Sequence, residues 1–132
     1  MRNVEDNSRE ELTLLELVLQ LHGEFRRSLE PIHVTPLQAG VLLFLRRQAT
    51  AKMTDAAAAL RGRLPTFSEV VNDLVRKRWL TRRYSVEDRR VVQLQLSRRG
   101  EVLTKQNEHH VRRVSGGGAA KKVMTTIVAK QQ

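Results

Sequence analysis

Residues 74–100 decide the fold, and they read LVRKRWLTRRYSVEDRRVVQLQLSRRG. Two β-prone runs flank a charged turn at residues 85–90. In the second run, Val92, Leu94 and Leu96 alternate with outward-facing positions, and this period of two is typical of a strand with one buried face. The sequence therefore predicts a β-hairpin with a basic turn.

Two short helices are expected directly before this hairpin. The first covers residues 55–60, with Thr54 as a candidate N-cap, and the second opens at residue 64 and continues to about residue 77. The turn at residues 61–63 joins them. Two helices joined in this way form a helix-turn-helix, and a hairpin that follows at once is a wing. We also expect Trp79 to pack in the core.

Further helices are expected on both sides of this winged unit. Residues 10–29 carry an apolar stripe wider than one core face needs, which indicates a helix that packs against its own domain and against a partner subunit. Thr35 caps a helix that begins at Pro36, and Ser97 caps another, which the glycines at residues 116–118 interrupt.

Composition and charge restrict the function. The chain has 132 residues and a net charge of +10, and residues 61–100 hold eleven Arg or Lys against four acids, a net of +7. Such a block indicates a polyanionic partner, most often nucleic acid, although a solvated basic surface is the alternative. No cysteine is present, which excludes disulfides, thiolate metal sites and a cysteine nucleophile.

Other classes of protein find no support in the sequence. No apolar run approaches the roughly 20 residues of a membrane span, and the acidic N-terminus does not suit a targeting peptide, so we expect a cytoplasmic protein with no membrane contact. The four histidines do not form a cluster, and no catalytic grouping or phosphate-binding loop occurs. We therefore expect no enzyme, no catalytic residue, no metal and no cofactor.

The stretch quoted above resembles the wing region of the MarR family of bacterial regulators. The shared marks are the acidic-Asp-Arg-Arg turn at residues 87–90, the alternating strand, and Leu-Ser-x-x-Gly at residues 96–100. Thr-Pro-Leu-Gln-Ala, residues 35–39, resembles the start of that family's second helix. The resemblance covers roughly residues 10–113. It implies a homodimer on a pseudo-palindromic operator, often released by a small aromatic effector.

Three features set this chain apart from the family pattern. Arg78 stands where the family usually has glycine after the recognition helix, so we expect that helix end to be built differently. Glu69 and Asp73 are expected to lower the positive charge on the DNA-facing side. The C-terminal helical region is shorter and less apolar than is usual.

We expect a mainly α chain with a small β-wing. Residues 1–9 are assigned to a flexible N-terminus, residues 10–34 and 101–130 to a helical dimerisation region, and residues 35–100 to a winged helix-turn-helix DNA-binding domain. Six apolar residues are candidates for the dimer interface: Leu14, Leu15, Val18, Leu21, Val123 and Ile127.

Candidate DNA contacts lie on the second helix of the helix-turn-helix, the turn before it and the hairpin. Short polar side chains at a recognition helix can reach base edges or phosphates, although capping or plain solvation is the alternative. By resemblance, Arg90 enters the minor groove and Asp88 orients it. The full set is Pro65, Thr66, Ser68, Glu69, Asn72, Arg61, Arg63, Arg82, Arg83, Asp88, Arg89 and Arg90.

The function expected from these features is sequence-specific binding of double-stranded DNA by a homodimer, as a transcriptional regulator of the repressor type. A small aromatic effector is a further possible partner. Two alternatives remain open. One is a winged-helix module that binds protein, which the acidic residues of the recognition helix and the short tail favour. The other is a basic RNA-associated protein.

Overall fold

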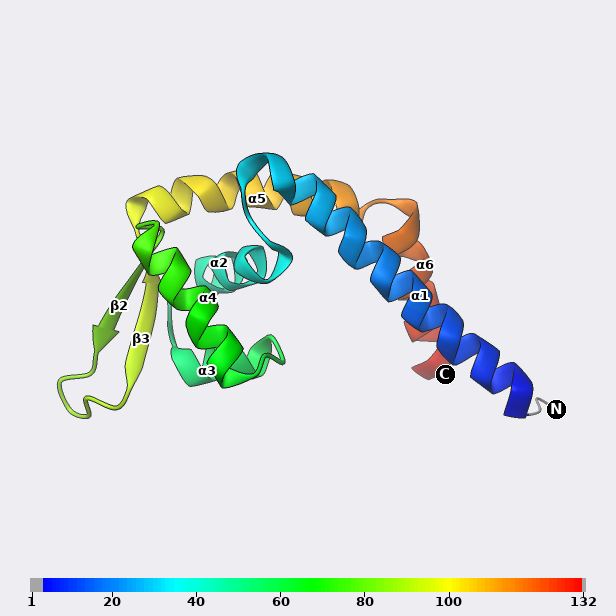
Figure 1. Ribbon diagram of the computed structural model, residues 1–132, viewed down its shortest axis with the longest axis horizontal. Helices are drawn as coiled ribbons and strands as arrows, with labels where there is room; N and C mark the ends of the chain where they lie inside the picture. Colours follow the sequence, from blue (N-terminus) through cyan, green and yellow to red (C-terminus); the bar gives the residue numbers. More distant parts are fainter. Residues whose placement is uncertain (1–3, 132) are drawn as a thin grey trace. The chain divides into compact units, whose positions relative to one another are not determined.

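The computed structural model describes residues 4–131, with side chains for residues 13–129. The chain forms two compact units (Figure 1). Unit 1 comprises residues 1–33 and 109–132, and unit 2 comprises residues 34–108. Unit 2 therefore includes all of residues 35–100, where the sequence predicts the winged helix-turn-helix.

Three helices of unit 2 precede its hairpin: α2, Pro36–Gln48; α3, Met53–Ala59; and α4, Leu64–Arg76. The predicted start of α2 is confirmed, because the Thr35 side chain accepts a hydrogen bond from the backbone N–H of Gln38 at 3.2 Å. The prediction for α3 is wrong in its cap. This helix begins at Met53 after Lys52, with no side-chain cap, so Thr54 lies inside the helix rather than before it.

A three-stranded antiparallel sheet completes unit 2, with β1 (Thr50–Lys52), β2 (Leu80–Tyr84) and β3 (Val92–Leu96) in the order β1-β3-β2. The predicted hairpin is confirmed, and Leu80 of β2 lies opposite Leu96 of β3. The sequence indicates a short extended stretch at residues 51–53, close to β1, but its pairing with β3 was not predicted. A strand of three residues is too short to show an alternation that would reveal its partner.

The core of unit 2 lies between its helices and one face of the sheet. Its fully or almost fully buried apolar residues are Val41, Leu42, Leu45, Ala56, Ala57, Phe67, Val71, Leu74, Leu80 and Leu94. Trp79 is partly buried and packs against this cluster, so the prediction that it is a core residue is confirmed. The two small alanines on α3 let neighbouring backbone approach closely.

The end of α4 keeps the left-handed geometry that glycine usually provides. Arg78 has a φ of 64°, and its N–H donates to the carbonyl of Val75 at 3.0 Å. The N–H of Trp79 donates to the carbonyl of Leu74, also at 3.0 Å. These two bonds form a Schellman motif. The expectation that Arg78 would require a different helix end is therefore wrong.

Ser97 and Gly100 join this helix end to the start of α5 (Arg98–Ser115). The Ser97 hydroxyl donates to the carbonyl of Arg78 at 2.5 Å and accepts from the N–H of Gly100 at 3.0 Å, which confirms Ser97 as the predicted cap. A Cβ on Gly100 would lie 2.0 Å from the carbonyl oxygen of Trp79. Only glycine permits this approach, which fixes the base of the wing.

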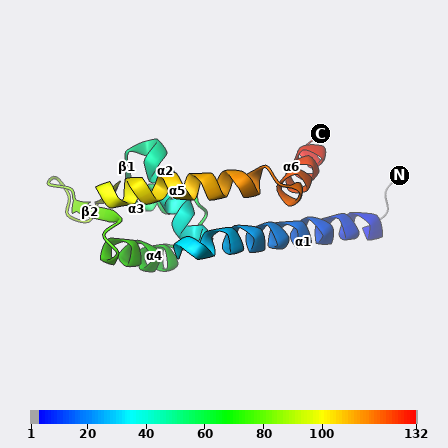
Figure 2. The ribbon, with the colours of Figure 1, turned by 90° about the horizontal axis from the view of Figure 1, so that it is seen from above.

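Unit 1 contains α1 (Val4–Leu29), the short 3-10 helix η1 (Glu30–Ile32), the end of α5 and α6 (Gly118–Gln131). Figure 2 shows α1 as one long helix, which begins six residues before the predicted start at Glu10. α1 and α6 pack against each other. Within residues 4–131, no helix is long and apolar enough to cross a membrane.

Candidate nucleic-acid interface

The recognition helix candidate, α4, has one buried face and one exposed polar face. Its buried residues Phe67, Val71 and Leu74 are completely inaccessible and belong to the core of unit 2. The exposed face carries Pro65, Thr66, Glu69 and Asn72 from the predicted set. The spacing of 65, 69 and 72 follows the helical repeat, so these side chains lie along one stripe.

Ser68 differs from its neighbours on α4. It is half-buried, and its hydroxyl donates to the sulfur of Met53, at the start of α3, over 3.8 Å. The hydroxyl therefore faces the contact between the two helices of the helix-turn-helix. Among the predicted base-reading residues, Ser68 is the one that the fold turns away from the exposed stripe.

The two arginines predicted on β2 lie on opposite faces of the sheet. Arg82 is opposite Leu94, so its side chain lies on the face that carries core residues, whereas Arg83 is opposite the exposed Gln93. Arg82 donates from Nη1 to the side-chain oxygen of Asn72 at 2.5 Å. The structure thus brings Arg82 to the exposed stripe of α4 and leaves Arg83 on the other side.

The wing tip is a turn that is tied together by its own hydrogen bonds. The backbone N–H of Ser85 donates to the carbonyl of Val91, and the N–H of Val91 donates to the carbonyl of Asp88, each at 3.0 Å. The Ser85 hydroxyl also accepts from the N–H of Glu87 at 3.3 Å. The turn is therefore held in one shape although it lies at the surface.

Asp88 holds Arg90 at this tip. Its Oδ1 accepts from the backbone N–H of Arg90 at 3.0 Å and from Nε at 3.2 Å, and its Oδ2 accepts from Nη2 at 3.4 Å. The backbone N–H of Arg90, followed by its side chain, holds the pKa of Asp88 below the usual value. The Arg90 side chain is nevertheless 91% exposed, so the guanidinium is oriented but available.

Arg61 and Arg63 flank the start of α4. Both side chains are exposed. Arg61 has a φ of 54° in the turn after α3, and Arg63 is the residue that directly precedes α4. The first N–H groups of a helix have no partner within the helix, so an anion is favoured at that end. The two guanidinium groups add positive charge at the same end.

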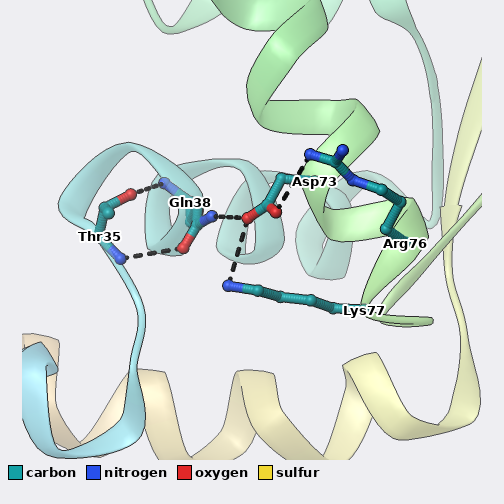
Figure 3. A network of polar contacts seen from close by, with 5 residues as sticks. All are labelled: Thr35, Gln38, Asp73, Arg76 and Lys77. Atoms are coloured by element: carbon teal, nitrogen blue, oxygen red, sulfur yellow. Dashed lines mark hydrogen bonds and ion pairs between the residues drawn. The ribbon is translucent and has the colours of Figure 1, made fainter.

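Asp73 lies at the edge of the exposed face of α4, where its carboxylate points toward α2 (Figure 3). Its Oδ2 accepts from Nε2 of Gln38 at 2.7 Å and lies 3.2 Å from Nζ of Lys77, and its Oδ1 lies 3.5 Å from Nη2 of Arg76. The expectation that Asp73 lowers the positive charge of this face stays a prediction, because its side chain is 35% exposed and two basic side chains pair with it.

The pKa of Asp73 reflects this network. Partial burial by itself would raise the pKa, but the hydrogen bonds from Lys77 and Gln38 and the nearby charge of Arg76 hold it below its usual value. Gln38 is only 6% exposed. Sequence reasoning missed its role, although Thr35-x-x-Gln38 has the spacing of a capping box.

The arrangement can bind a polyanion but offers no metal site among the residues that the structure describes. No group of three or more His, Asp or Glu side chains gathers there. What unit 2 presents is a polar helix face, Arg82 beside it, arginines at its start and an oriented arginine at the wing tip. This is the chemistry of a groove-binding surface with phosphate contacts around it.

Residues 34–91 match the MarR family. Among curated proteins, the chain is 27% identical over 92 residues to the HTH-type transcriptional repressor MdtR of Bacillus subtilis (strain 168). This match covers 70% of the chain and 59% of MdtR, so the chain spans less than two thirds of that relative.

Solved structures share the fold. A mutant of MarR from E. coli in complex with operator DNA superposes with a TM-score of 0.74 at 18% identity, over 93% of this chain and 85% of that one. Bordetella bronchiseptica BpsR, whose DNA binding is regulated by 6-hydroxynicotinic acid, gives 0.75 at 21% identity, over 92% and 96%. At these identities the likeness establishes a winged helix fold.

Proposed function

We propose that the protein is a transcriptional regulator of the repressor type that binds double-stranded DNA in a sequence-specific way. The premise is that residues 34–91 match the MarR family. The proposal includes a homodimer and a pseudo-palindromic operator. It draws further support from the repressor MdtR, which resembles 70% of the chain.

The wing tip is the observation that carries this proposal. An exposed arginine normally samples many rotamers, and fixing it on binding costs conformational entropy. Asp88 already restrains Arg90 through its backbone and its side chain, while 91% of the Arg90 side chain stays exposed. A pre-oriented guanidinium on a projecting turn suits insertion into a narrow minor groove, where the negative potential is strongest.

The exposed stripe of α4 supplies the proposed major-groove contacts. Thr66 can bond a base edge or a phosphate, and Glu69 can accept from the exocyclic amine of cytosine. Asn72 has its oxygen engaged by Arg82, so its amide N–H groups are the part that remains for a base acceptor or a phosphate. Arg61, Arg63, Arg82, Arg83 and Arg89 are proposed phosphate contacts.

The proposed homodimer is supported by apolar surface on unit 1. Leu15 and Val18 on α1 are 54% and 43% exposed, and Ile127 on α6 is 38% exposed. Val123, in contrast, is only 7% exposed within the single chain, so it can add little to an interface. Val18→Asp should shift the protein toward monomer in sedimentation velocity. An unchanged dimer would place the interface elsewhere.

An open surface pocket within unit 1 is the candidate site for a small acidic effector. Its volume is about 530 Å³, and its polar lining comprises Arg27, Arg113, Ser28, His110 and one carboxylate, Glu24. The Ser28 hydroxyl lies 3.2 Å from Nδ1 of His110. We propose that a carboxylate would meet the two arginines here. 6-Hydroxynicotinic acid is the probe to titrate, with release of bound DNA as the readout.

Selection of bound duplexes from a genomic pool tests the function directly. The proposal expects an enriched pseudo-palindrome that binds at nanomolar concentration, with an affinity that falls steeply with salt. Arg90→Ala should weaken that binding about tenfold or more. Arg26→Ala is the matched control, because it removes the same charge from an exposed position on α1 in unit 1 and should leave affinity unchanged.

The outcomes separate the competing functions. Equal, weak binding to every duplex DNA would contradict the proposal and favour a protein-binding winged helix. Tighter binding to duplex RNA than to any DNA would favour an RNA-associated protein. If Arg90→Ala leaves operator affinity unchanged, the role of the wing tip is contradicted, but the proposed function is not.

A further inference from the structure

We propose that Gln38 is a positioning residue for DNA recognition, because it fixes how the recognition helix α4 is turned. This inference rests on the proposed function, since it assigns a role in operator recognition to a residue that does not reach the exposed stripe. Gln38 lies on α2, is 6% exposed and cannot contact DNA itself.

Both ends of the Gln38 amide are engaged (Figure 3). Its Oε1 accepts from the backbone N–H of Thr35 at 3.1 Å, and this bond belongs to the capping box at the start of α2. Its Nε2 donates to Oδ2 of Asp73 on α4 at 2.7 Å. The amide thus ties Asp73 to a cap that is itself held by the bond from the Gln38 N–H to Thr35.

The hydrogen bond from Gln38 to Asp73 fixes the rotation of α4 relative to α2, which the apolar core does not. α2 and α4 otherwise meet through aliphatic side chains and Phe67, and the hydrophobic effect that joins them does not depend on direction. Within the described residues, Gln38 to Asp73 is the only side-chain hydrogen bond between the two helices. A short hydrogen bond to a carboxylate is both strong and directional.

The contact of Asp73 with α2 determines the direction of the side chains that we propose contact bases. Asp73 directly follows Asn72 and comes one helical turn after Glu69. Successive residues on a helix are about 100° apart, so a rotation of α4 that released Asp73 would turn Asn72 and Glu69 away from the same groove. Arg76 on α4 and Lys77, its C-cap residue, pair with Asp73 from the same helix end and cannot provide this anchor.

Two variants separate anchoring from capping. Gln38→Glu keeps an oxygen that can accept from the N–H of Thr35, but it removes the donor to Asp73 and sets two carboxylates against each other. Adding Asp73→Asn restores a hydrogen bond with donor and acceptor exchanged, and it returns the net charge to that of the natural chain. Gln48→Glu, at the exposed end of α2, is the matched control for the added negative charge.

The first readout is the ratio of affinities for the selected operator and an unrelated duplex, measured well below the unfolding temperature. We expect Gln38→Glu to lower this ratio about tenfold, Gln48→Glu to change it less than about twofold, and the double variant to recover most of it. A lowered unfolding temperature with an unchanged ratio would mean that Gln38 only stabilises the fold. Loss without recovery in the double variant would also overturn the proposal.

The second readout does not need DNA. Amide hydrogen exchange in residues 70–76 should speed up in Gln38→Glu and return toward the natural rate in the double variant. If the natural protein selects no duplex, the proposed function fails, and exchange alone then decides whether Gln38 anchors α4. Unchanged exchange in Gln38→Glu would overturn the anchoring role.

Discussion

Replacing Gly100 by alanine tests the junction between α4, the wing and α5. The added Cβ would lie 2.0 Å from the carbonyl oxygen of Trp79 and 2.9 Å from its carbonyl carbon, whereas Cβ atoms essentially never approach other atoms within 3.0 Å. The backbone must therefore separate by about 1 Å, in a well-packed region that resists such shifts.

Two hydrogen bonds cross the gap that would have to widen. The N–H of Ser97 donates to the carbonyl of Trp79 at 3.0 Å, and the Ser97 hydroxyl donates to the carbonyl of Arg78 at 2.5 Å. Overpacking of this kind costs about 1–3 kcal/mol, and each weakened bond costs about 1 kcal/mol more. The higher helix propensity of alanine offsets about 1 kcal/mol. We expect a net loss of about 2–4 kcal/mol in the free energy of unfolding.

Urea unfolding at a fixed protein concentration measures this loss. Trp79 is the only tryptophan in the chain, so its fluorescence reports on this junction, and far-UV circular dichroism provides an independent signal. Gly23→Ala is the matched control. A Cβ on Gly23 meets nothing within 4 Å, so this variant should gain about 0.5–1 kcal/mol. A loss under about 0.5 kcal/mol for Gly100→Ala would refute the steric reasoning.

Three further predictions follow from local geometry. Ala49→Gly should raise the free energy of unfolding by about 1 kcal/mol, because Ala49 is exposed and has φ 63° and ψ −58°, which glycine adopts with less strain; a destabilised variant in urea would contradict this. Asp73→Asn should flatten the dependence of stability on pH. The pKa of Asp73 is lowered in the folded chain, so its contribution is present above the ordinary value of 3.8 and is lost as the pH falls through the folded value; parallel curves in urea titrations at several acidic pH values would contradict this. Asp88→Asn should weaken operator binding about threefold to tenfold in fluorescence anisotropy without changing stability, because Arg90 loses a charged partner at an exposed site; equal affinity would show that Arg90 needs no orientation.

Local signals in the sequence are sufficient to predict most elements of unit 2. Thr35-Pro36 and Ser97 act within one helical turn of their own position, and the alternation in residues 91–96 depends only on neighbouring side chains. The prediction that Thr54 caps α3 was wrong because a tertiary contact sets the start of this helix. β1 pairs with β3 as far as Lys52, so the helix begins as soon as that pairing ends.

The orientation of polar residues on α4 could not be predicted in the same way. Asp73 and Asn72 are adjacent, both are polar, and an amphipathic pattern assigns both to the exposed side. What separates them is Gln38, a residue 35 positions earlier in the chain. The capping box that contains Gln38 was visible in the spacing from Thr35, but the partner of its amide nitrogen depends on the packing of α2 against α4.

Arg61 and Arg78 show how the helix-turn-helix combines a backbone requirement with charge. Both have positive φ values, 54° and 64°, and each stands directly after the C-cap of its helix, α3 or α4. Glycine would adopt these angles at about 1 kcal/mol less. An arginine near the last carbonyls of a helix regains about 0.3–1 kcal/mol through the helix dipole, and it adds positive charge to the block at residues 61–100. The conformational cost is therefore largely offset within the same turn, and the added charge lies in the unit that we propose meets DNA.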